Sequence, residues 1–178
     1  MKLKRSNDRK VANAVSPNGK TPTIANTFGL PAGKDFSCPN QTPTCSKVCY
    51  AGKLEKIYKG VRDTLLHNWN LLKDADHDTM EKLISDMIDE FRADCDKRNA
   101  PKLFRIHWDG DFFNDTYTFA WKHVILNNPM KEMIGRVGAK CPENKKAIPL
   151  IDKEGSACVK CSLCVYNKAD IVFSAKKR

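Results

Sequence analysis

The sequence lacks the long apolar run that a membrane-spanning helix requires. Crossing a bilayer takes about 18–20 consecutive apolar residues, and no stretch of these 178 residues approaches that length. The opening residues, Met1-Lys2-Leu3-Lys4-Arg5, are followed by no apolar segment of the kind found in secretory signals. We therefore expect a soluble protein that has no membrane partner and resides in the cytoplasm.

Three common catalytic signatures are also missing. The chain contains no glycine-rich phosphate-binding loop, no Gly-x-Ser-x-Gly nucleophile turn and no His-Glu-x-x-His zinc motif. Nucleotide hydrolysis, serine hydrolysis and zinc-protease chemistry therefore have no support in the sequence. Hydrophobic residues nevertheless make up 41% of the chain, which is enough for one packed core.

Positive charge is in excess and is unevenly distributed. Lysine and arginine number 31 against 21 acidic residues, which gives a formal net charge of +10. Residues 1–50 and 131–178 are basic, whereas residues 51–130 are slightly acidic. Basic surfaces attract nucleic acid by neutralising phosphates, but the same charge also serves solubility and can offset clustered thiolates. The charge alone therefore leaves these alternatives open.

The chain has eight cysteines, and seven of them fall in the two basic ends. The first group is Cys38, Cys45 and Cys49, the second is Cys141, Cys158, Cys161 and Cys164, and Cys95 stands alone. Because the cytosol keeps thiols reduced, clustered cysteines there are most simply metal ligands. We interpret both groups as metal-binding and Cys95, at the end of an apolar stripe, as a small buried hydrophobe.

The two cysteine groups differ in the metal they favour. Cys158, Cys161 and Cys164 are separated by two residues each, a spacing more typical of iron–sulfur ligation than of zinc, which usually takes separated pairs. The first group offers three thiols, which can hold three irons of a four-iron cluster and leave the fourth open to another ligand. Zinc remains the alternative for either group.

Apolar periodicity predicts helices and one central strand. The expected elements are helices over 53–73, 78–95 and 115–127, a strand over 103–108, and shorter strands over 133–137 and 171–173, with loops over 1–35. Helices that alternate with a buried strand indicate an α/β fold. We expect a small, partial-barrel-like domain with few strands, long helices and metal-tied cysteine loops at both ends.

We expect the chain to form a single domain over residues 1–178. It comprises an N-terminal loop segment with the first cysteine group (1–52), a helix-helix-strand-helix core (53–130) and a cysteine-rich C-terminal segment (131–178).

Asp109-Gly110-Asp111 follows the expected central strand. Functional loops sit at the carboxyl ends of strands in α/β folds, and a glycine there lets the backbone approach a ligand. A simple turn with a helix-capping acid is the reading that residue identity alone favours. The four histidines are scattered, and His107 beside this turn is the single candidate ligand among them, although a core role suits it better.

Three segments together resemble a known family. They are Thr27–Gly33 leading into Cys38, Cys45 and Cys49-Tyr50-Ala51-Gly52-Lys53, then Arg105–Phe112, and then Cys158-x-x-Cys161-x-x-Cys164 with Cys141-Pro142. This pattern resembles the phage family called gene product 88, which is itself similar to radical S-adenosylmethionine (SAM) proteins. The resemblance implies a cytoplasmic iron–sulfur protein of phage origin, in the host cytosol, that would need an electron donor.

The resemblance also assigns roles to particular residues. It implies that Cys38, Cys45 and Cys49 hold a 4Fe-4S cluster and that Gly110 and Asp111 contact the amino group of SAM. It further implies that the C-terminal group, Cys141, Cys158, Cys161 and Cys164, holds a second cluster or zinc.

Two departures from the radical SAM pattern bear on activity. The first-group cysteines are spaced six and then three residues apart rather than three and then two, and the chain passes quickly from Pro129 to Cys141, as in a shortened member. The expected function is radical-SAM-like redox chemistry or the role of a non-catalytic relative. The alternative is a zinc-stabilised nucleic-acid-binding module that uses the basic ends.

Overall fold

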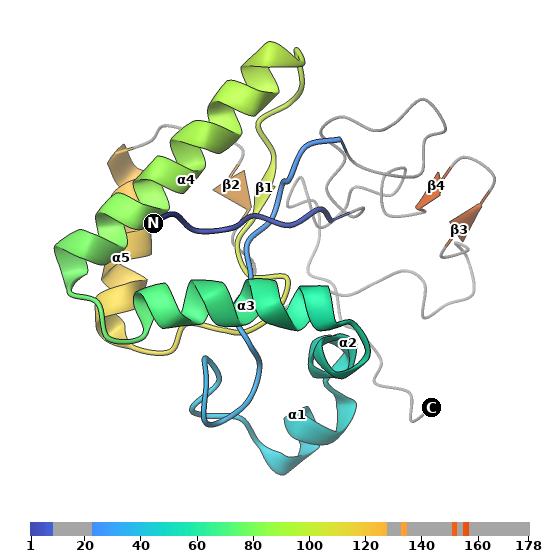
Figure 1. The fold of residues 1–178 in the computed structure, drawn as a ribbon. Helices are drawn as coiled ribbons and strands as arrows, with labels where there is room; N and C mark the ends of the chain where they lie inside the picture. Colours follow the sequence, from blue (N-terminus) through green and yellow to red (C-terminus); the bar gives the residue numbers. More distant parts are fainter. Residues whose placement is uncertain (9–22, 128–132, 135–150, 153–154, 157–178) are drawn as a thin grey trace.

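The computed structural model describes residues 1–8, 23–127, 133–134, 151–152 and 155–156, and helices dominate this part of the chain (Figure 1). The helices are α1 (Pro43–Val48), α2 (Tyr50–Ile57), α3 (Lys59–Leu72), α4 (His77–Lys97) and α5 (Asp115–Asn127). The strands are β1 (Phe104–Arg105), β2 (Met133–Ile134), β3 (Ile151–Asp152) and β4 (Gly155–Ser156). None of the described helices is both long and apolar enough to span a bilayer.

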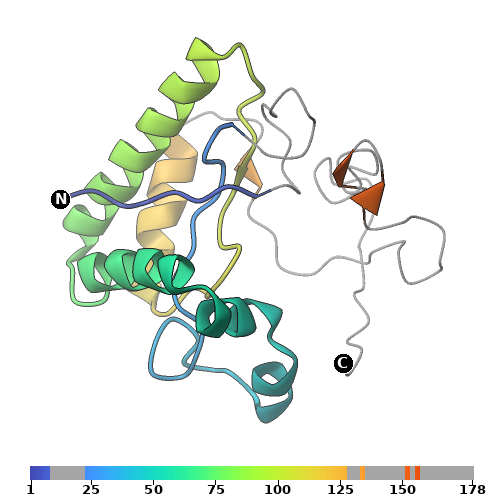
Figure 2. The same ribbon diagram turned by 45° about the vertical axis from the view of Figure 1, so that its right-hand side comes forward.

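A narrow set of extended segments forms the centre of the fold (Figure 2). Ser6 pairs antiparallel with Thr27, Thr27 pairs parallel with Arg105, and β1 pairs parallel with β2. β3 and β4 form a separate antiparallel pair. The described residues form no barrel, so the expectation of a partial barrel is wrong for this part of the chain. The fold is mixed but mostly helical, because each strand is only two residues long.

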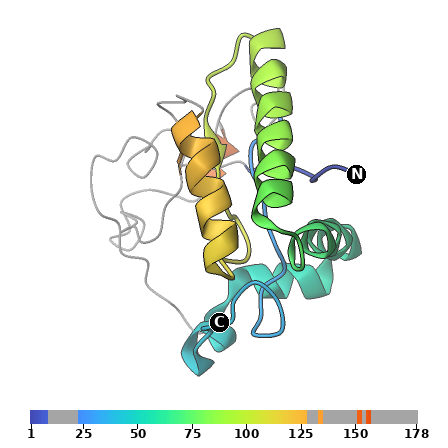
Figure 3. The same ribbon diagram turned by 90° about the vertical axis from the view of Figure 1, so that its left-hand side faces the viewer.

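Helices α4 and α5 pack side by side against the extended segments (Figure 3). The N-cap Asp76 begins α4 by accepting a 2.7 Å hydrogen bond from the Thr79 N–H, and Asn114 accepts one of 2.8 Å from Tyr117 at the start of α5. Both helices and their apolar stripes were predicted from the sequence and are confirmed. Their buried side chains are Met80, Ile84, Met87, Ile88, Phe91, Cys95, Tyr117, Ala120, Trp121 and Val124.

The single helix predicted over residues 53–73 is in fact two helices. Tyr58 is extended, with φ −114° and ψ 103°, and it separates α2 from α3, which run in different directions (Figure 1). Ile57 and Tyr58 are exposed, although periodicity placed them on the buried stripe. The break therefore turns the apolar side chains at the end of α2 away from the core, while Leu65 and Leu72 of α3 remain buried.

The predicted strand over 103–108 is also shorter than expected. His107 has a φ of +52°, in the left-handed region, and this conformation cannot continue a strand. β1 therefore spans only Phe104–Arg105. The strand expected over 133–137 is seen at Met133–Ile134, and the one expected over 171–173 lies outside the described residues.

The N-terminal segments are held by a buried asparagine of α3. The Asn68 side chain donates to the carbonyls of Lys4 and Gly29, at 2.9 and 3.1 Å, and accepts from the Lys4 N–H at 2.8 Å. Arg5 adds an ion pair with Asp94 of α4 at 2.6 Å. Within residues 1–8 and 23–35 the expected loops are present, with isolated bridges at Ser6 and Thr27, and side chains satisfy some of their backbone groups.

Candidate functional site

An open cavity of about 390 Å³ lies between the first cysteine group and the loop that follows β1. Cys38, Cys45 and Cys49 line one part of it, and Gly110 and Asp111 line another. Small-molecule sites in proteins typically measure roughly 300–1,000 Å³, so the cavity is large enough for a ligand. Residues that are far apart in the sequence, and that sequence patterns single out separately, therefore meet in one place.

The cysteine side of the cavity is shaped by two helix starts. Thr42 caps α1, a short helix in a segment expected to be loop, and its side chain accepts a hydrogen bond from the N–H of Cys45 at 3.1 Å. Cys49 is the N-cap of α2, and its sulfur accepts from the Gly52 N–H at 3.3 Å. Cys45 is exposed, and Cys38 and Cys49 are half-buried. Backbone amides directed at sulfur are also typical of metal-bound thiolates.

The opposite side is a loop fixed to the backbone of residues 28–31. The N–H of Trp108 donates to the Phe28 carbonyl at 3.0 Å, and that of Leu30 donates to the Asp109 carbonyl at 3.1 Å. The buried Ser37 hydroxyl accepts from the Asp111 N–H at 3.2 Å. These bonds hold the exposed carboxylate of Asp111 at the edge of the cavity.

Gly110 is required by the conformation of this loop. Its φ is +77°, a region that side chains other than glycine rarely adopt. A Cβ there would overlap the Ser37 hydroxyl and would lie 2.7 Å from the Leu30 carbonyl oxygen. The backbone can therefore pass this close to residues 30–37 only without a side chain, and this passage brings Asp111 to the cavity.

Groups that can carry negative charge lie around Cys38. Burial raises the pKa of its thiol and outweighs the hydrogen bond from the Gly33 backbone, which lowers it. Negative charge on Asp111 and on Cys49 raises this pKa further, so these groups are close enough to interact. A bound cation would reverse the effect, because a metal ion deprotonates the thiols that coordinate it.

The three sulfurs of the first cysteine group are not gathered as closely as the ligands of a single ion. Within the part of the chain that the structure describes, the sulfurs of Cys38, Cys45 and Cys49 do not all lie within 4.8 Å of one another. Thiolates around one zinc ion, each about 2.3 Å from the metal, lie closer together than that. A four-iron cluster is larger and holds its thiolates farther apart.

A buried acid lies beside the cavity. Asp109 is only 3% exposed, and burial together with the nearby Glu55 carboxylate raises its pKa to about 8, against the lowering effects of the Gly110 N–H and Arg105. The N–H of Gly110 donates to the Asp109 side chain at 2.8 Å. Asp109 is therefore mostly protonated at neutral pH. The interaction with Glu55, which is on α2, joins the two sides of the cavity.

His107 packs among aromatic side chains, which agrees with the core role expected from the sequence. Its Nε2 is 2.7 Å from the Tyr117 hydroxyl, and its ring contacts those of Phe28, Phe112 and Trp121. Burial lowers its pKa to about 3, so the ring is neutral. Although His107 also lines the cavity, these contacts account for it as a packing residue.

A second, basic cavity shares Cys49 with the first. It measures about 510 Å³, and its lining includes Lys47, Lys53, Lys56 and Arg62. These cations come from the end of α1, from α2 and from the start of α3. The surface on this side of the cysteines therefore attracts anions.

The C-terminal cysteines, Cys141, Cys158, Cys161 and Cys164, lie outside the described residues.

Two of the histidines lie close together. The expectation that the histidines are scattered is wrong for His77 and His123, whose ring centroids are 4.9 Å apart. His77 is on α4 and His123 is on α5, so no spacing within one helix could have revealed this contact.

Comparisons with known proteins support the phage origin. The family described as Gene product 88 matches residues 1–133. The chain is 42% identical to the "Gene 88 protein" of Mycobacterium phage L5 and 40% identical to that of Mycobacterium phage D29, in alignments that cover 99% of each chain. These alignments run over 237 residues, so the relatives carry residues with no counterpart among the 178 of this chain.

No solved structure matches the chain. The family match covers the cysteine loop, the segment after β1 and all five described helices. The chain therefore belongs to the Gene product 88 family.

Proposed function

We propose that this phage protein binds a four-iron cluster through Cys38, Cys45 and Cys49. We further propose that the adjoining cavity accepts an amino-bearing ligand of the SAM type at Gly110 and Asp111. The observation that carries the proposal is the cavity of about 390 Å³, which these five residues line together. A cluster with three protein thiolates has one iron free for a ligand, where it supplies Lewis-acid or one-electron chemistry.

The chain's own residues then have separate tasks. The three thiolates hold the metal, and the exposed carboxylate of Asp111 accepts hydrogen bonds from a ligand ammonium group. The backbone at Gly110 lets the ligand approach closely, because no side chain stands in the way. The protonated Asp109 adds no negative charge beside the thiolates at neutral pH, which limits repulsion in the site.

Anaerobic reconstitution of the full chain with iron and sulfide tests the metal. We expect a brown protein with iron and sulfide in near-equal amounts, and loss of about four irons in Cys45→Ser. Cys95→Ala is the matched control, because Cys95 is buried in the core away from the cavity, and it should retain all the iron. Absence of iron from the wild type, or full iron in Cys45→Ser, would refute the proposal.

The iron content of Cys161→Ser, compared with that of Cys45→Ser, shows whether the two cysteine groups form separate centres. If each variant loses only part of the iron, then the chain holds two centres. If either change removes all of it, the groups share one.

The electron paramagnetic resonance spectrum of the reduced cluster tests the ligand. Addition of SAM should change the spectrum of the wild type, and the change should be absent in Asp111→Ala. A cluster whose spectrum SAM does not change would mean that the cavity does not accept this ligand, and that the chain is a non-catalytic relative.

The basic cavity favours a second candidate, a zinc-stabilised nucleic-acid-binding module. Four cations line this cavity, and phosphates are their natural ligands. This function predicts a colourless protein that contains zinc and whose affinity for DNA falls steeply with salt. Each phosphate contact contributes about −0.9 to the slope of log K against log salt, so Lys53→Ala should reduce the slope by about that amount.

A further inference from the structure

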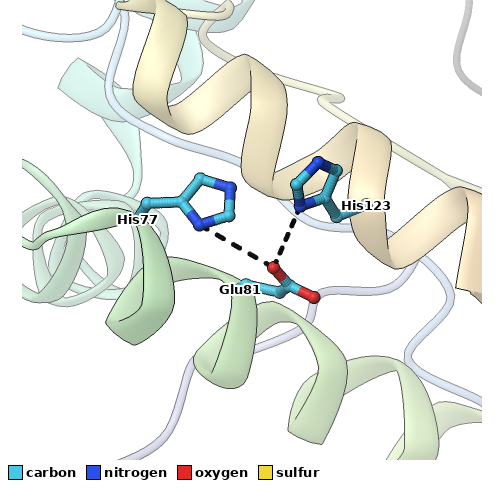
Figure 4. Close-up of side chains that lie close together, drawn as sticks. All are labelled: His77, Glu81 and His123. Atoms are coloured by element: carbon cyan, nitrogen blue, oxygen red, sulfur yellow. Dashed lines mark hydrogen bonds and ion pairs between the residues drawn. The ribbon is translucent and has the colours of Figure 1, made fainter.

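We propose that His77, Glu81 and His123 form a binding site for a divalent transition-metal ion between α4 and α5 (Figure 4). One ligand atom from each residue can be chosen such that all three lie within 4.8 Å of one another. The Glu81 carboxylate oxygen is 3.8 Å from Nδ1 of His77 and 3.2 Å from Nδ1 of His123. The site is on different elements from the cysteine cavity and does not depend on the function proposed for it.

The separations are close to those that a metal imposes. Imidazole nitrogens and carboxylate oxygens bind zinc at about 2.0–2.2 Å, which puts neighbouring donors of a tetrahedral site about 3.4 Å apart. The two distances to Glu81, 3.2 and 3.8 Å, lie on either side of that value. Small changes in side-chain rotamers would therefore bring the three atoms around one ion.

The helices place these ligands without loops. His77 and Glu81 are one turn apart in α4, so they share a face, and His123 approaches from α5. Next to them, Met80 and Ile84 of α4 and Val124 of α5 belong to the buried core. Because the core fixes the two helices relative to each other, the ligands are held on rigid elements, as metal sites require.

The donor chemistry selects the class of ion. Two imidazoles and one carboxylate suit zinc, cobalt, nickel, copper or ferrous iron, whereas calcium and magnesium prefer all-oxygen sites. The side chains of His77, Glu81 and His123 are 31%, 30% and 49% exposed, so an ion can enter from solvent and keep a water ligand. Asp78, fully exposed and 3.2 Å from His77, adds negative charge beside the site.

In the absence of metal the same atoms form ordinary hydrogen bonds. Nδ1 of His123 is 3.2 Å from a Glu81 carboxylate oxygen, and Nδ1 of His77 is close to the carboxylates of both Asp78 and Glu81. An ion would bind Nδ1 of each neutral ring, and the single ring proton would then be on Nε2. Binding would thus link α4 to α5 through coordinate bonds in place of weak polar contacts.

Titration of the full chain with Co²⁺, after its cysteines have been filled with their own metal, tests the proposal. We expect one further equivalent of Co²⁺, with ligand-field absorption but no sulfur-to-metal charge transfer, since the donors are nitrogen and oxygen. His123→Gln and Glu81→Gln should each weaken this binding by at least about tenfold. His67→Gln, which changes a histidine outside the site, is the matched control and should bind as the wild type does.

Thermal unfolding gives an independent readout. Saturating Zn²⁺ should raise the unfolding midpoint of the wild type and of His67→Gln, and should not raise that of His123→Gln, because the ion binds only the folded site. All these positions are on the surface, so the variants should fold. Equal Co²⁺ stoichiometry and affinity in the wild type and in His123→Gln, or sulfur charge transfer in all the bound Co²⁺, would overturn the proposal.

Discussion

Replacing Asp109 by asparagine should remove a large pH dependence from the free energy of unfolding. Its pKa is about 8 in the folded protein and 3.8 in the reference state, because burial and Glu55 disfavour the charged form. Below about pH 4 the carboxyl is neutral in both states, and its stabilising contribution is fully present. As the pH rises from there to about 8, the unfolded chain has lost the proton and the folded chain keeps it, so stability falls.

The size of the effect follows from proton linkage. One proton retained only by the folded state lowers the free energy of unfolding by a little over 1 kcal/mol per pH unit. Between about pH 5 and pH 7 the wild type should therefore lose roughly 3 kcal/mol relative to Asp109→Asn. The asparagine amide is never charged, and it keeps the size and shape of the protonated acid.

Urea unfolding of both proteins across this pH range, with the same metal content, provides the assay. The difference in free energy between Asp109→Asn and the wild type should grow with pH and level off above about pH 8. Asp74→Asn, at an exposed site between α3 and α4, controls for the loss of one negative charge. If the curves of Asp109→Asn and the wild type run parallel, or if the variant becomes relatively less stable as the pH rises, the assignment of a neutral Asp109 is wrong.

Two further substitutions test the backbone of the fold. Gly110→Ala should lower the free energy of unfolding by about 2–5 kcal/mol, because residue 110 has a positive φ and the new Cβ would overlap the backbone. The control Gly60→Ala lies in α3 with open space around it, so it should leave the free energy of unfolding unchanged or raise it by up to about 1 kcal/mol. Asn68→Ala removes three hydrogen bonds to the N-terminal segments and should lower the free energy of unfolding by about 2–4 kcal/mol. Its control, Asn70→Ala, is on the exposed side of the same helix and should change the free energy of unfolding by less than about 0.5 kcal/mol. Urea unfolding measures all four, and equal effects within either pair would contradict the reasoning.

Helices with strong periodicity and a capping residue were predictable from sequence. In α4 the apolar positions recur every three or four residues after the N-cap Asp76, and the face that they form is the one buried in the core. The break at Tyr58 was not predictable, because Ile57 and Tyr58 continue the same apolar spacing and yet are exposed. Periodicity reports which residues could share a face, and it does not report whether the chain turns between them.

The strand after Pro101 shows a similar limit. Its aromatic and branched residues predict six extended residues. In the structure, the backbone at His107 is left-handed, and its ring forms a hydrogen bond with Tyr117 and packs among aromatic rings. Tyr117 and Trp121 come from α5 and Phe28 from the N-terminal part of the chain, so no local pattern contains them. Tertiary contacts therefore shorten the strand and produce the loop that reaches the cavity.

The candidate site was predictable only in part. The cysteine motif and the position of Asp109-Gly110-Asp111 after a strand single out both sides of the cavity from sequence alone. The interaction of Asp109 with Glu55, and the approach of His77 to His123, join different elements and depend on how these pack. Residue types and spacings within a segment carry no information about such pairs.

The position of Trp108 has a practical consequence. Of the three tryptophans, Trp108 lines the cavity beside the cysteines, whereas Trp121 is buried in the core and Trp69 packs on Phe36 and Phe113. An indole next to a coloured centre loses its excitation by energy transfer instead of emitting light. For the cluster proposed above, intrinsic fluorescence offers a label-free gauge of occupancy, and changing Trp108 to phenylalanine should reduce the dimming that accompanies filling of the cavity.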